Sequence, residues 1–267
     1  MSRPTRPSPR PDPGAVPAPA PRLEVAGLTV SFGGLTALDG VDLTVGDAET
    51  VALIGPNGAG KTTVFNAVCG LVRPTSGSVR IGGAGAPASA TGLLGRGVAR
   101  TLQGLGLFDG MTVLENVLVP ATAARVGPRR GARGGAAPSE PRAAADAVLE
   151  RLGLLDVAGT PVEALPYPDR KRVALARALV TRPRLLLLDE PAGGLGAEDI
   201  AALAGTVRDV VAGGCSVLLV EHHVDFVMDV ADRVVVLDFG RVVASGTPDQ
   251  VRADPAVEAA YLGLVAA

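Results

Sequence analysis

A glycine-rich stretch that ends in lysine and threonine carries the clearest chemical signal in this sequence. It follows the apolar run 51–54 and precedes a helical pattern of apolar residues, which is the context expected of a phosphate-binding loop. Glycines let the backbone curl until successive N–H groups point at phosphate oxygens, and the helix N-terminus adds the positive end of its dipole. Lys61 would contact the β- and γ-phosphates, and the Thr62 hydroxyl would ligate Mg²⁺. The predicted loop consists of Gly55, Pro56, Asn57, Gly58, Ala59, Gly60, Lys61, Thr62 and Thr63.

Two carboxylates form the second signal, because Asp189 and Glu190 directly follow the apolar run 185–188. In an open parallel sheet, ligands bind at the carboxyl ends of the strands. Asp189 is suited to holding Mg²⁺, and Glu190 to polarising a water for attack on a γ-phosphate. A solvent-facing acidic pair is the alternative, and the phosphate loop upstream favours the functional interpretation.

Three further residues are weaker candidates when each is taken alone. His222 and His223 are the only histidines, and they follow the apolar run 215–220; a histidine there could hydrogen-bond a γ-phosphate oxygen and the attacking water. Phe32 precedes a Gly-Gly break, and could either stack on a purine ring or pack as a core aromatic. Gln103 follows a short strand pattern and would otherwise be an ordinary loop residue.

Composition restricts the class of protein. The chain has 267 residues and 47% hydrophobic residues, which suits one domain of moderate size or a core with an inserted subdomain. Its net charge of -2 produces no strong electrostatic field that would attract nucleic acid, and no aromatic residues interleave the arginines of the predicted surface loop 122–142.

Cys69 and Cys215 are interpreted as buried hydrophobic residues rather than as a disulfide or metal site. No apolar run approaches the roughly 20 residues that span a bilayer, and no signal peptide is evident, so we expect a cytosolic chain. Lys61 and Lys171 are the only lysines.

Strand and helix patterns predict an α/β fold. Apolar residues alternate through 23–45, which indicates short half-buried strands in an antiparallel layer. The apolar runs before the candidate residues predict the strands of a buried parallel sheet. Residues 1–21 are rich in proline and poor in apolar bulk, so we expect a disordered tail.

The motifs, their order and their spacing together resemble the ATP-binding subunit of ABC transporters, over roughly residues 23–263. Within that family the sequence is most similar to the branch that drives uptake of branched-chain amino acids in bacteria. The resemblance to the branch rests on 32–34, 100–103, 107–108, 111–117, 221–222 and 260–263.

This resemblance implies a P-loop NTPase with a RecA-like parallel sheet core, an antiparallel β layer and an inserted α-helical subdomain at about 104–182, all within an ATP-binding domain at 22–267. It implies that Phe32 stacks on adenine and that Gln103 senses Mg²⁺ and couples to the membrane partner. It further implies that Asp189 binds Mg²⁺, that Glu190 is the catalytic base and that His222 is the switch histidine. His223 has no matching role. ATP and Mg²⁺ are the implied ligands, and the implied partners are transmembrane permease subunits, a substrate-binding protein acting through them, and a second ATP-binding subunit.

Two segments depart from the family pattern. The signature segment, whose glycines contact the γ-phosphate held by the opposite subunit, here consists of Leu165, Pro166, Tyr167, Pro168 and Asp169. Pro168 stands where a glycine is expected and has no N–H to donate; losing one charge-assisted hydrogen bond costs about 1.5–3 kcal/mol. Arg170 replaces a glutamine, and Gly196-Ala197 replaces Asn-Pro. Both departures concern what the chain offers its neighbour.

The leading hypothesis is therefore an ATPase subunit at the cytoplasmic face of the membrane, importing branched-chain or other small amino acids or amides. A homodimer would have two weak sites, and a heterodimer with an intact subunit would have one strong site. The first alternative is a nucleotide-binding, hydrolysis-impaired interaction module, which Pro168 favours and which Glu190 and His222 oppose. A soluble ABC ATPase acting on ribosomes or DNA usually carries two cassettes or long coiled coils. A small-molecule kinase or GTPase would lack Gln103, Glu190 and His222 in this order.

Overall fold

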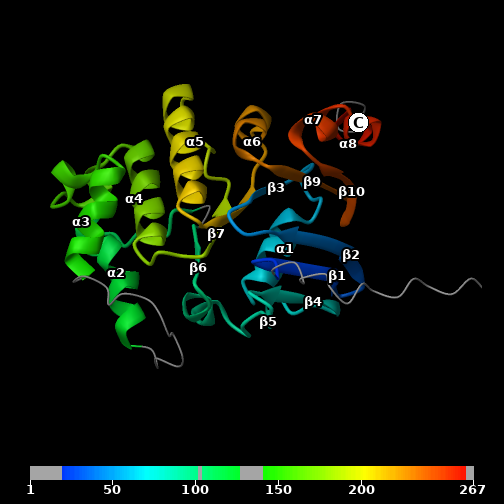
Figure 1. Cartoon of the computed structure of the whole chain (residues 1–267), viewed down its shortest axis with the longest axis horizontal. Coiled ribbons are helices and arrows are strands. Elements are labelled where there is room, and N and C mark those ends of the chain that lie inside the picture. Colours follow the sequence, from blue (N-terminus) through cyan, green and yellow to red (C-terminus); the bar gives the residue numbers. More distant parts are fainter. Residues whose placement is uncertain (1–19, 102–103, 127–140, 263–267) are drawn as a thin grey trace, which may run out of the picture.

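The computed structural model describes residues 20–101, 104–126 and 141–262 (Figure 1). Nearly all of the predicted tail and most of the predicted 122–142 loop lie outside these residues, as does Gln103. Among the described residues, no helix is both long enough and apolar enough to cross a membrane. Cys69 and Cys215 are free and buried, as predicted, and burial raises the pKa of both thiols, that of Cys215 to about 11.

A six-stranded sheet with the order β10-β9-β3-β8-β7-β6 forms the centre of the fold. All neighbouring strands are parallel except β10, which pairs antiparallel with β9. The strands are β3 (Thr50–Ile54), β6 (Val98–Arg100), β7 (Leu185–Asp189), β8 (Ser216–Val220), β9 (Arg233–Asp238) and β10 (Arg241–Gly246). The predicted parallel core is therefore confirmed.

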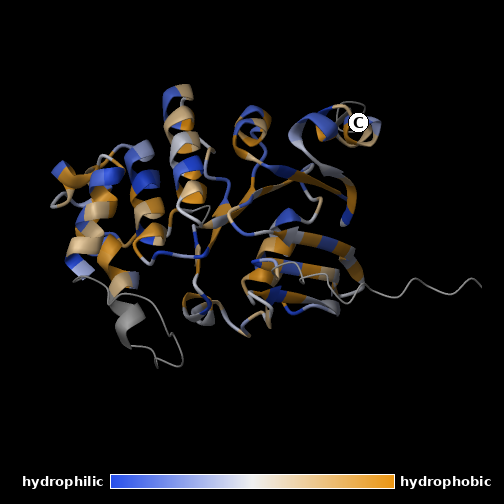
Figure 2. Ribbon diagram, in the orientation of Figure 1, coloured by the Kyte–Doolittle hydropathy of each residue, from blue (hydrophilic) through white to orange (hydrophobic). Residues whose placement is uncertain are grey.

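Strands β3, β7, β8 and β9 are buried on both faces of the sheet, which explains why they contain unbroken apolar runs. Along β7, Leu186 and Leu188 pack into one hydrophobic core, and Leu185 and Leu187 pack into a second core on the opposite face. Figure 2 shows the strands coloured as hydrophobic almost throughout, whereas the helices carry hydrophilic residues as well.

A second, four-stranded sheet has the order β2-β1-β4-β5, and its neighbouring strands are antiparallel. It confirms the predicted antiparallel layer, including the turn at Gly33-Gly34 between its first two strands. Helix α1 (Lys61–Val68) contributes Val64, Phe65 and Val68 to the core that this sheet shares with the central sheet. The strands are β1 (Leu23–Phe32), β2 (Leu35–Val45), β4 (Ser76–Ile81) and β5 (Ala84–Gly85).

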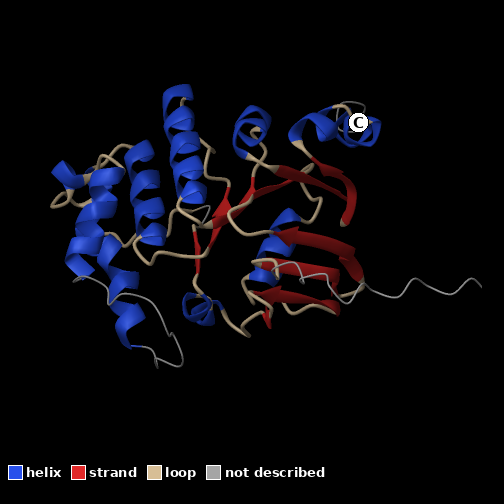
Figure 3. Cartoon of the chain, in the orientation of Figure 1, coloured by secondary structure: helices blue, strands red, loops and turns tan. Residues whose placement is uncertain are grey.

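Most of the remaining helices cover the other face of the central sheet, and α2, α3 and α4 lie together at one end of the molecule (Figures 1 and 3). The spacing of Thr112 and Glu115 in the sequence predicts a capping box that opens a helix. The structure confirms it at the start of α2, because Thr112 Oγ1 accepts the Glu115 N–H and Glu115 accepts the Thr112 N–H. Two predicted boundaries are wrong. Helix α2 runs on into the predicted loop 122–142, and α3 begins at Pro141, whereas the apolar pattern predicts a helix that begins at Ala143. These helices are α2 (Val113–Val126), α3 (Pro141–Arg151), α4 (Tyr167–Leu179), α5 (Ala197–Ala212), α6 (Val224–Val230), α7 (Pro248–Arg252) and α8 (Pro255–Leu262).

Candidate functional site

Three strand ends bring the predicted site residues to one edge of the central sheet. Strand β8 lies between β3 and β7 and runs parallel to both. The carboxyl ends of the three strands therefore point the same way, at the edge where ligands bind in open α/β sheets. The phosphate loop follows β3, Glu190 follows β7, and Glu221 and His222 follow β8.

The loop after β3 has the backbone that its glycines were expected to provide. Gly55 has φ 151°, and a Cβ at this position would lie 2.0 Å from the Leu237 carbonyl oxygen. Gly60 caps α1 at φ 104°, and a Cβ there would meet the Leu38 side chain at 2.7 Å. Only glycine fits such positions without displacing the neighbouring chain. The curled loop and the helix start form a cradle that fits an anionic phosphate chain.

Lys61 folds back over its own loop. Its Nζ donates to the carbonyl oxygens of Gly55 at 2.7 Å and Pro56 at 2.9 Å. The side chain is buried, and this burial lowers the pKa of its ammonium, while the nearby Glu190 charge opposes the shift. The ammonium is thus held against the carbonyl oxygens of its own loop.

The residues predicted to hold Mg²⁺ supply hard oxygen ligands. Asp189 ends β7, and its N–H donates to Thr101 Oγ1 at 3.3 Å. Burial first, and the neighbouring Glu190 charge second, raise the pKa of the Asp189 carboxyl. Thr62 is exposed at the start of α1. Within the described chain no group of three or more His, Cys, Asp or Glu forms a metal site on its own. The donor set fits Mg²⁺, which binds through one or two protein oxygens, waters and substrate phosphates.

Glu190 and His222 lie at the ends of neighbouring strands. His222 Nδ1 is 3.9 Å from Glu190 Oε1. The Glu190 backbone has φ 47°, a left-handed conformation that is strained for a residue other than glycine and that often marks functional sites. The structure places these two predicted residues together; His223, which had no predicted role, caps α6 by accepting the Phe226 N–H at 3.4 Å.

Glu221 is a residue whose importance the sequence did not reveal. It is fully buried, and its carboxylate accepts N–H bonds from Ala192 at 2.7 Å, His222 at 2.8 Å and His223 at 2.9 Å. It therefore ties the segment after Glu190 to the segment that carries His222. An acidic residue at the end of a buried strand was the available signal, but its partner Ala192 follows another strand, β7.

Phe32 ends β1 and exposes 50% of its surface. The core-aromatic interpretation is therefore wrong. An exposed ring beside the Gly33-Gly34 turn remains compatible with the predicted stacking on a base.

The signature segment Leu165–Asp169 leads into α4, and Pro168 is the second residue of that helix. The N–H at this position has no partner within a helix, so proline is accommodated without loss of helical hydrogen bonds. Asp169 pairs with Arg172 at 3.0 Å. The substitution by proline is thus compatible with the fold, while it removes one donor from the end of the helix.

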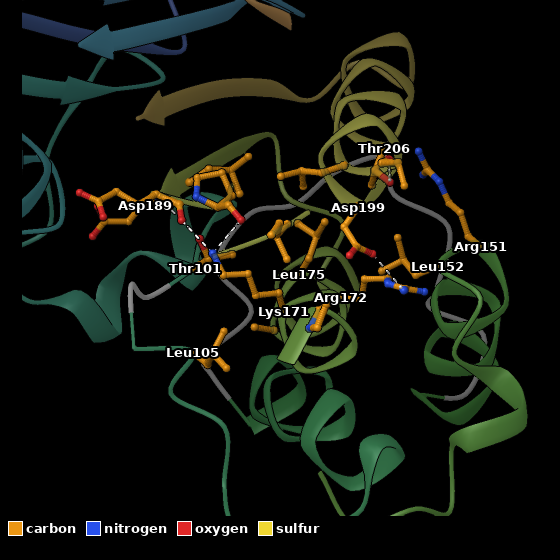
Figure 4. Close-up of a pocket in the computed structure, with 18 residues that line it drawn as sticks. Thr101, Leu105, Arg151, Leu152, Lys171, Arg172, Leu175, Asp189, Asp199 and Thr206 are labelled. Atoms are coloured by element: carbon orange, nitrogen blue, oxygen red, sulfur yellow. Dashed lines mark hydrogen bonds and ion pairs between the residues drawn. The ribbon is translucent and has the colours of Figure 1, made fainter. Parts of the chain in front are cut away.

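Two basic residues of α4 reach backbone carbonyls elsewhere and were not predicted to do so. Arg177 donates to the carbonyl oxygens of Gly106 at 2.5 Å and Leu105 at 3.0 Å. Lys171 donates to the carbonyl oxygens of Glu190 at 3.0 Å and Pro191 at 2.8 Å. Figure 4 shows Lys171 extending from α4 toward the end of β7, along a cavity of about 250 Å³ that Leu152, Leu175 and Thr206 also line.

Comparison with known proteins identifies the family of this chain. The family model for ABC transporters matches residues 38–193, and the model for the branched-chain amino acid ATP-binding cassette transporter matches residues 241–266. The high-affinity branched-chain amino acid transport ATP-binding protein BraF of Pseudomonas aeruginosa is 41% identical, covering 91% of this chain and 98% of its own length. LivG of Escherichia coli K12, of the same description, is 40% identical with the same coverage.

Solved structures agree with this assignment. A crystal structure of the ADP conformation of an ATP-binding cassette of an ABC transporter is 28% identical, with a TM-score of 0.79, covering 91% of this chain and 99% of that one. A nucleotide-free ATP-binding cassette is 27% identical, with a TM-score of 0.78 and the same coverage. The strand order, the phosphate loop and the strand-end carboxylates are those of a P-loop NTPase, and the chain belongs to the ABC transporter ATP-binding proteins, in the branched-chain amino acid family.

Proposed function

We propose that this chain hydrolyses ATP to drive import of branched-chain or other small amino acids or amides through membrane partners. The relatives with the highest identity reported above are named for branched-chain amino acid transport, which supports the class of cargo. The observation that carries the proposal is the meeting of Lys61, Glu190 and His222 at the ends of three adjacent strands.

Each side chain has a role that its position supports. Lys61 neutralises the β- and γ-phosphates from above the loop, and Phe32 stacks on the adenine from the exposed end of β1. Glu190, as the catalytic base, accepts a proton from the attacking water, and His222 contacts the γ-phosphate. Water attacks the γ-phosphorus, the bond to the bridging oxygen breaks, and ADP and phosphate leave. Gln103 keeps its proposed role of sensing Mg²⁺ and coupling to the membrane partner.

Mg²⁺ would be held by the Thr62 hydroxyl and the Asp189 carboxylate, together with phosphate oxygens. When bound, it neutralises charge that develops on those oxygens.

The proposed partners are transmembrane permease subunits at the cytoplasmic face of the membrane, with a substrate-binding protein acting through them. We further propose that the second ATP-binding subunit is a different chain. Pro168 removes an N–H from the start of α4, and Gly196, which replaces the usual asparagine, caps α5 without a side-chain hydrogen bond. Both changes lie in segments that we propose contact the neighbouring subunit, while the chain's own phosphate loop and carboxylates are complete.

Steady-state ATP hydrolysis at increasing protein concentration tests the proposal in wild type, Pro168→Gly and Glu190→Gln. We expect wild type to lie near the Glu190→Gln blank and Pro168→Gly to rise with the square of concentration, by about 10- to 100-fold for one recovered charge-assisted bond. Pro248→Gly is a matched control, because Pro248 also occupies the first turn of a helix, α7, outside the proposed interface.

Three outcomes are informative. If wild type already hydrolyses with a square dependence, the proline is tolerated and a homodimeric ATPase is the better description. If Pro168→Gly binds ATP and stays at the blank, the chain is a hydrolysis-impaired interaction module. If wild type binds no ATP, the proposed function fails altogether.

A further inference from the structure

Lys171 connects the helix that follows the signature segment to the turn that carries Glu190. It is one of only two lysines in the chain, and its Nζ donates to two consecutive carbonyl oxygens, those of Glu190 and Pro191. Burial lowers the pKa of this ammonium, and the charges of Glu221 and Glu190 oppose the shift. Lys171 is partly buried, and a cation that loses part of its hydration is stabilised by hydrogen bonds that replace it.

The turn that Lys171 holds is strained. Glu190 has φ 47°, and a non-glycine residue persists in this conformation only when its surroundings fix it. Its N–H donates to the Val220 carbonyl at 2.8 Å, and its carbonyl oxygen accepts the Gly193 N–H at 3.2 Å as well as the Lys171 ammonium. The direction of the Glu190 side chain therefore depends on the hydrogen bonds that its own N–H and its own carbonyl oxygen make.

A second contact joins the same two segments. The Tyr167 ring lies 5.6 Å from Lys171 Nζ, and a Cβ on Gly194 would lie 3.0 Å from a Tyr167 ring carbon. Gly194 has φ +75°, so it favours glycine for two reasons. The first turns of α4, including the signature residue Tyr167, thus touch residues 190–194 at two places.

A cavity lies next to this connection. The cavity of about 250 Å³ lies beside Lys171 and is lined by Leu175 of α4, Leu188 of β7 and Leu203 of α5 (Figure 4). Leu175, Leu188 and Ala192 belong to one hydrophobic core, so α4 packs against this region, and the two hydrogen bonds of Lys171 add a directed contact to the Glu190 turn beside the space that the apolar side chains leave.

We propose that Lys171 is a positioning residue that sets the orientation of Glu190 from the signature end of α4. Contact between the signature segment and a neighbouring subunit would thereby change the orientation of the Glu190 carboxylate in the same chain. This inference rests on the proposed hydrolysis of ATP, and its test is designed so that the two can fail separately.

All chains in this test carry Pro168→Gly, the background in which hydrolysis is expected to be measurable, and wild type below means Lys171 in that background. It is compared with Lys171→Met, which keeps the aliphatic stem and removes the three donors. With protein in excess over radiolabelled ATP, we expect the single-turnover rate to fall about 10- to 100-fold, the loss typical of a reacting group displaced by about 1 Å. We expect the ATP dissociation constant and the melting temperature to stay at wild-type values. Hydrogen exchange of the amides in 187–196, measured by mass spectrometry, should accelerate while exchange elsewhere does not change.

Two variants serve as matched comparisons. Lys171→Arg retains a cationic donor and should recover most of the rate and of the exchange protection. Arg172→Met alters the next residue of the same helix, whose guanidinium makes partly exposed pairs with Asp169 and Asp199; such pairs contribute little, and the rate should stay near wild type.

A wild-type rate and wild-type exchange in Lys171→Met would overturn the inference. A slower rate accompanied by a lower melting temperature and by faster exchange throughout the chain would also overturn it, since that pattern shows general destabilisation. If the Pro168→Gly chain with Lys171 is no faster than the same chain with Glu190→Gln, the proposed hydrolysis fails; in that case faster exchange confined to 187–196 in Lys171→Met would still support the positioning contact, and unchanged exchange would overturn it.

Discussion

The two lysines of the chain make the same kind of contact in two different parts of the fold. Lys61 Nζ donates to the carbonyl oxygens of Gly55 and Pro56, and Lys171 Nζ donates to those of Glu190 and Pro191. Each ammonium therefore holds a turn at the carboxyl end of a buried strand, β3 in one case and β7 in the other.

The difference lies in how far each lysine reaches along the chain. Lys61 contacts carbonyls five and six residues before it, whereas Lys171 contacts carbonyls 19 and 20 residues after it. The first arrangement lies within one contiguous motif, since Lys61 and the carbonyls that it contacts all belong to the phosphate loop. The second exists only because α4 packs beside the end of β7. A local motif can therefore be identified in a sequence, while an equally specific tertiary contact by the same residue type leaves no pattern.

The largest effect that separates the two lysines should be on nucleotide binding. Lys61→Met removes a charge-assisted contact to the phosphates, worth about 1.5–3 kcal/mol for each bond, so ATP binding should weaken by about tenfold or more. Lys171→Met should leave it unchanged, because that ammonium faces backbone carbonyls. Isothermal titration with ATP and with inorganic tripolyphosphate measures this.

Tripolyphosphate lacks adenine and is therefore the control for contacts to the adenine ring. ATP and tripolyphosphate should lose affinity equally in Lys61→Met. If Lys171→Met weakened ATP binding as much as Lys61→Met does, the two lysines would belong to one binding site and the distinction would be lost.

An intermediate effect should come from the second anchor of the Glu190 turn. Glu221 accepts three N–H bonds in full burial, and Glu221→Gln turns an NH₂ group toward donors that need an acceptor. The free energy of unfolding should fall by about 1.5–3 kcal/mol, the range for bonds to a charged group. Urea unfolding followed by circular dichroism measures the loss.

Glu190→Gln is the matched control, because its partly exposed side chain should change stability little. This result would separate Glu221, which stabilises the fold, from Lys171, which orients one turn. Equal stability of Glu221→Gln and wild type would show that the three N–H groups find other acceptors.

The smallest effect should be a pH-dependent gain of stability in Asp189→Asn. Burial raises the pKa of Asp189, so its ionised form destabilises the folded state at neutral pH. This penalty disappears as the pH falls through the folded-state pKa, because the folded chain then takes up the proton more readily than the unfolded chain does.

The melting temperature of Asp189→Asn without nucleotide should therefore exceed that of wild type at pH 7, and the gap should close in acid. Asp199→Asn, which replaces an aspartate of α5 that pairs with Arg172, is the control for removing a carboxylate elsewhere in the fold. A gap that does not depend on pH would point to a cause other than the charge.

Much of the fold followed from local patterns. Apolar alternation located β1 and β2, unbroken apolar runs located β3, β7 and β8, and Thr112 with Glu115 located the start of α2. The misses are at boundaries that local residues do not mark. Helix α2 continues through Pro120 to Val126 because apolar residues earlier in the helix, such as Val113 and Val117, are packed in the core, and this tertiary packing outweighs the loop-like composition that follows.

The sequence by itself determined the residue types that can bind a nucleotide: a glycine loop with its lysine, two acids after an apolar run, and a histidine after another. It also determined the family, because those motifs recur in order. Only the tertiary structure decided that Glu221 joins two strand ends and that Lys171 holds the Glu190 turn. Such contacts join residues far apart in the chain, and their geometry depends on how helices and strands pack rather than on any spacing that the sequence displays.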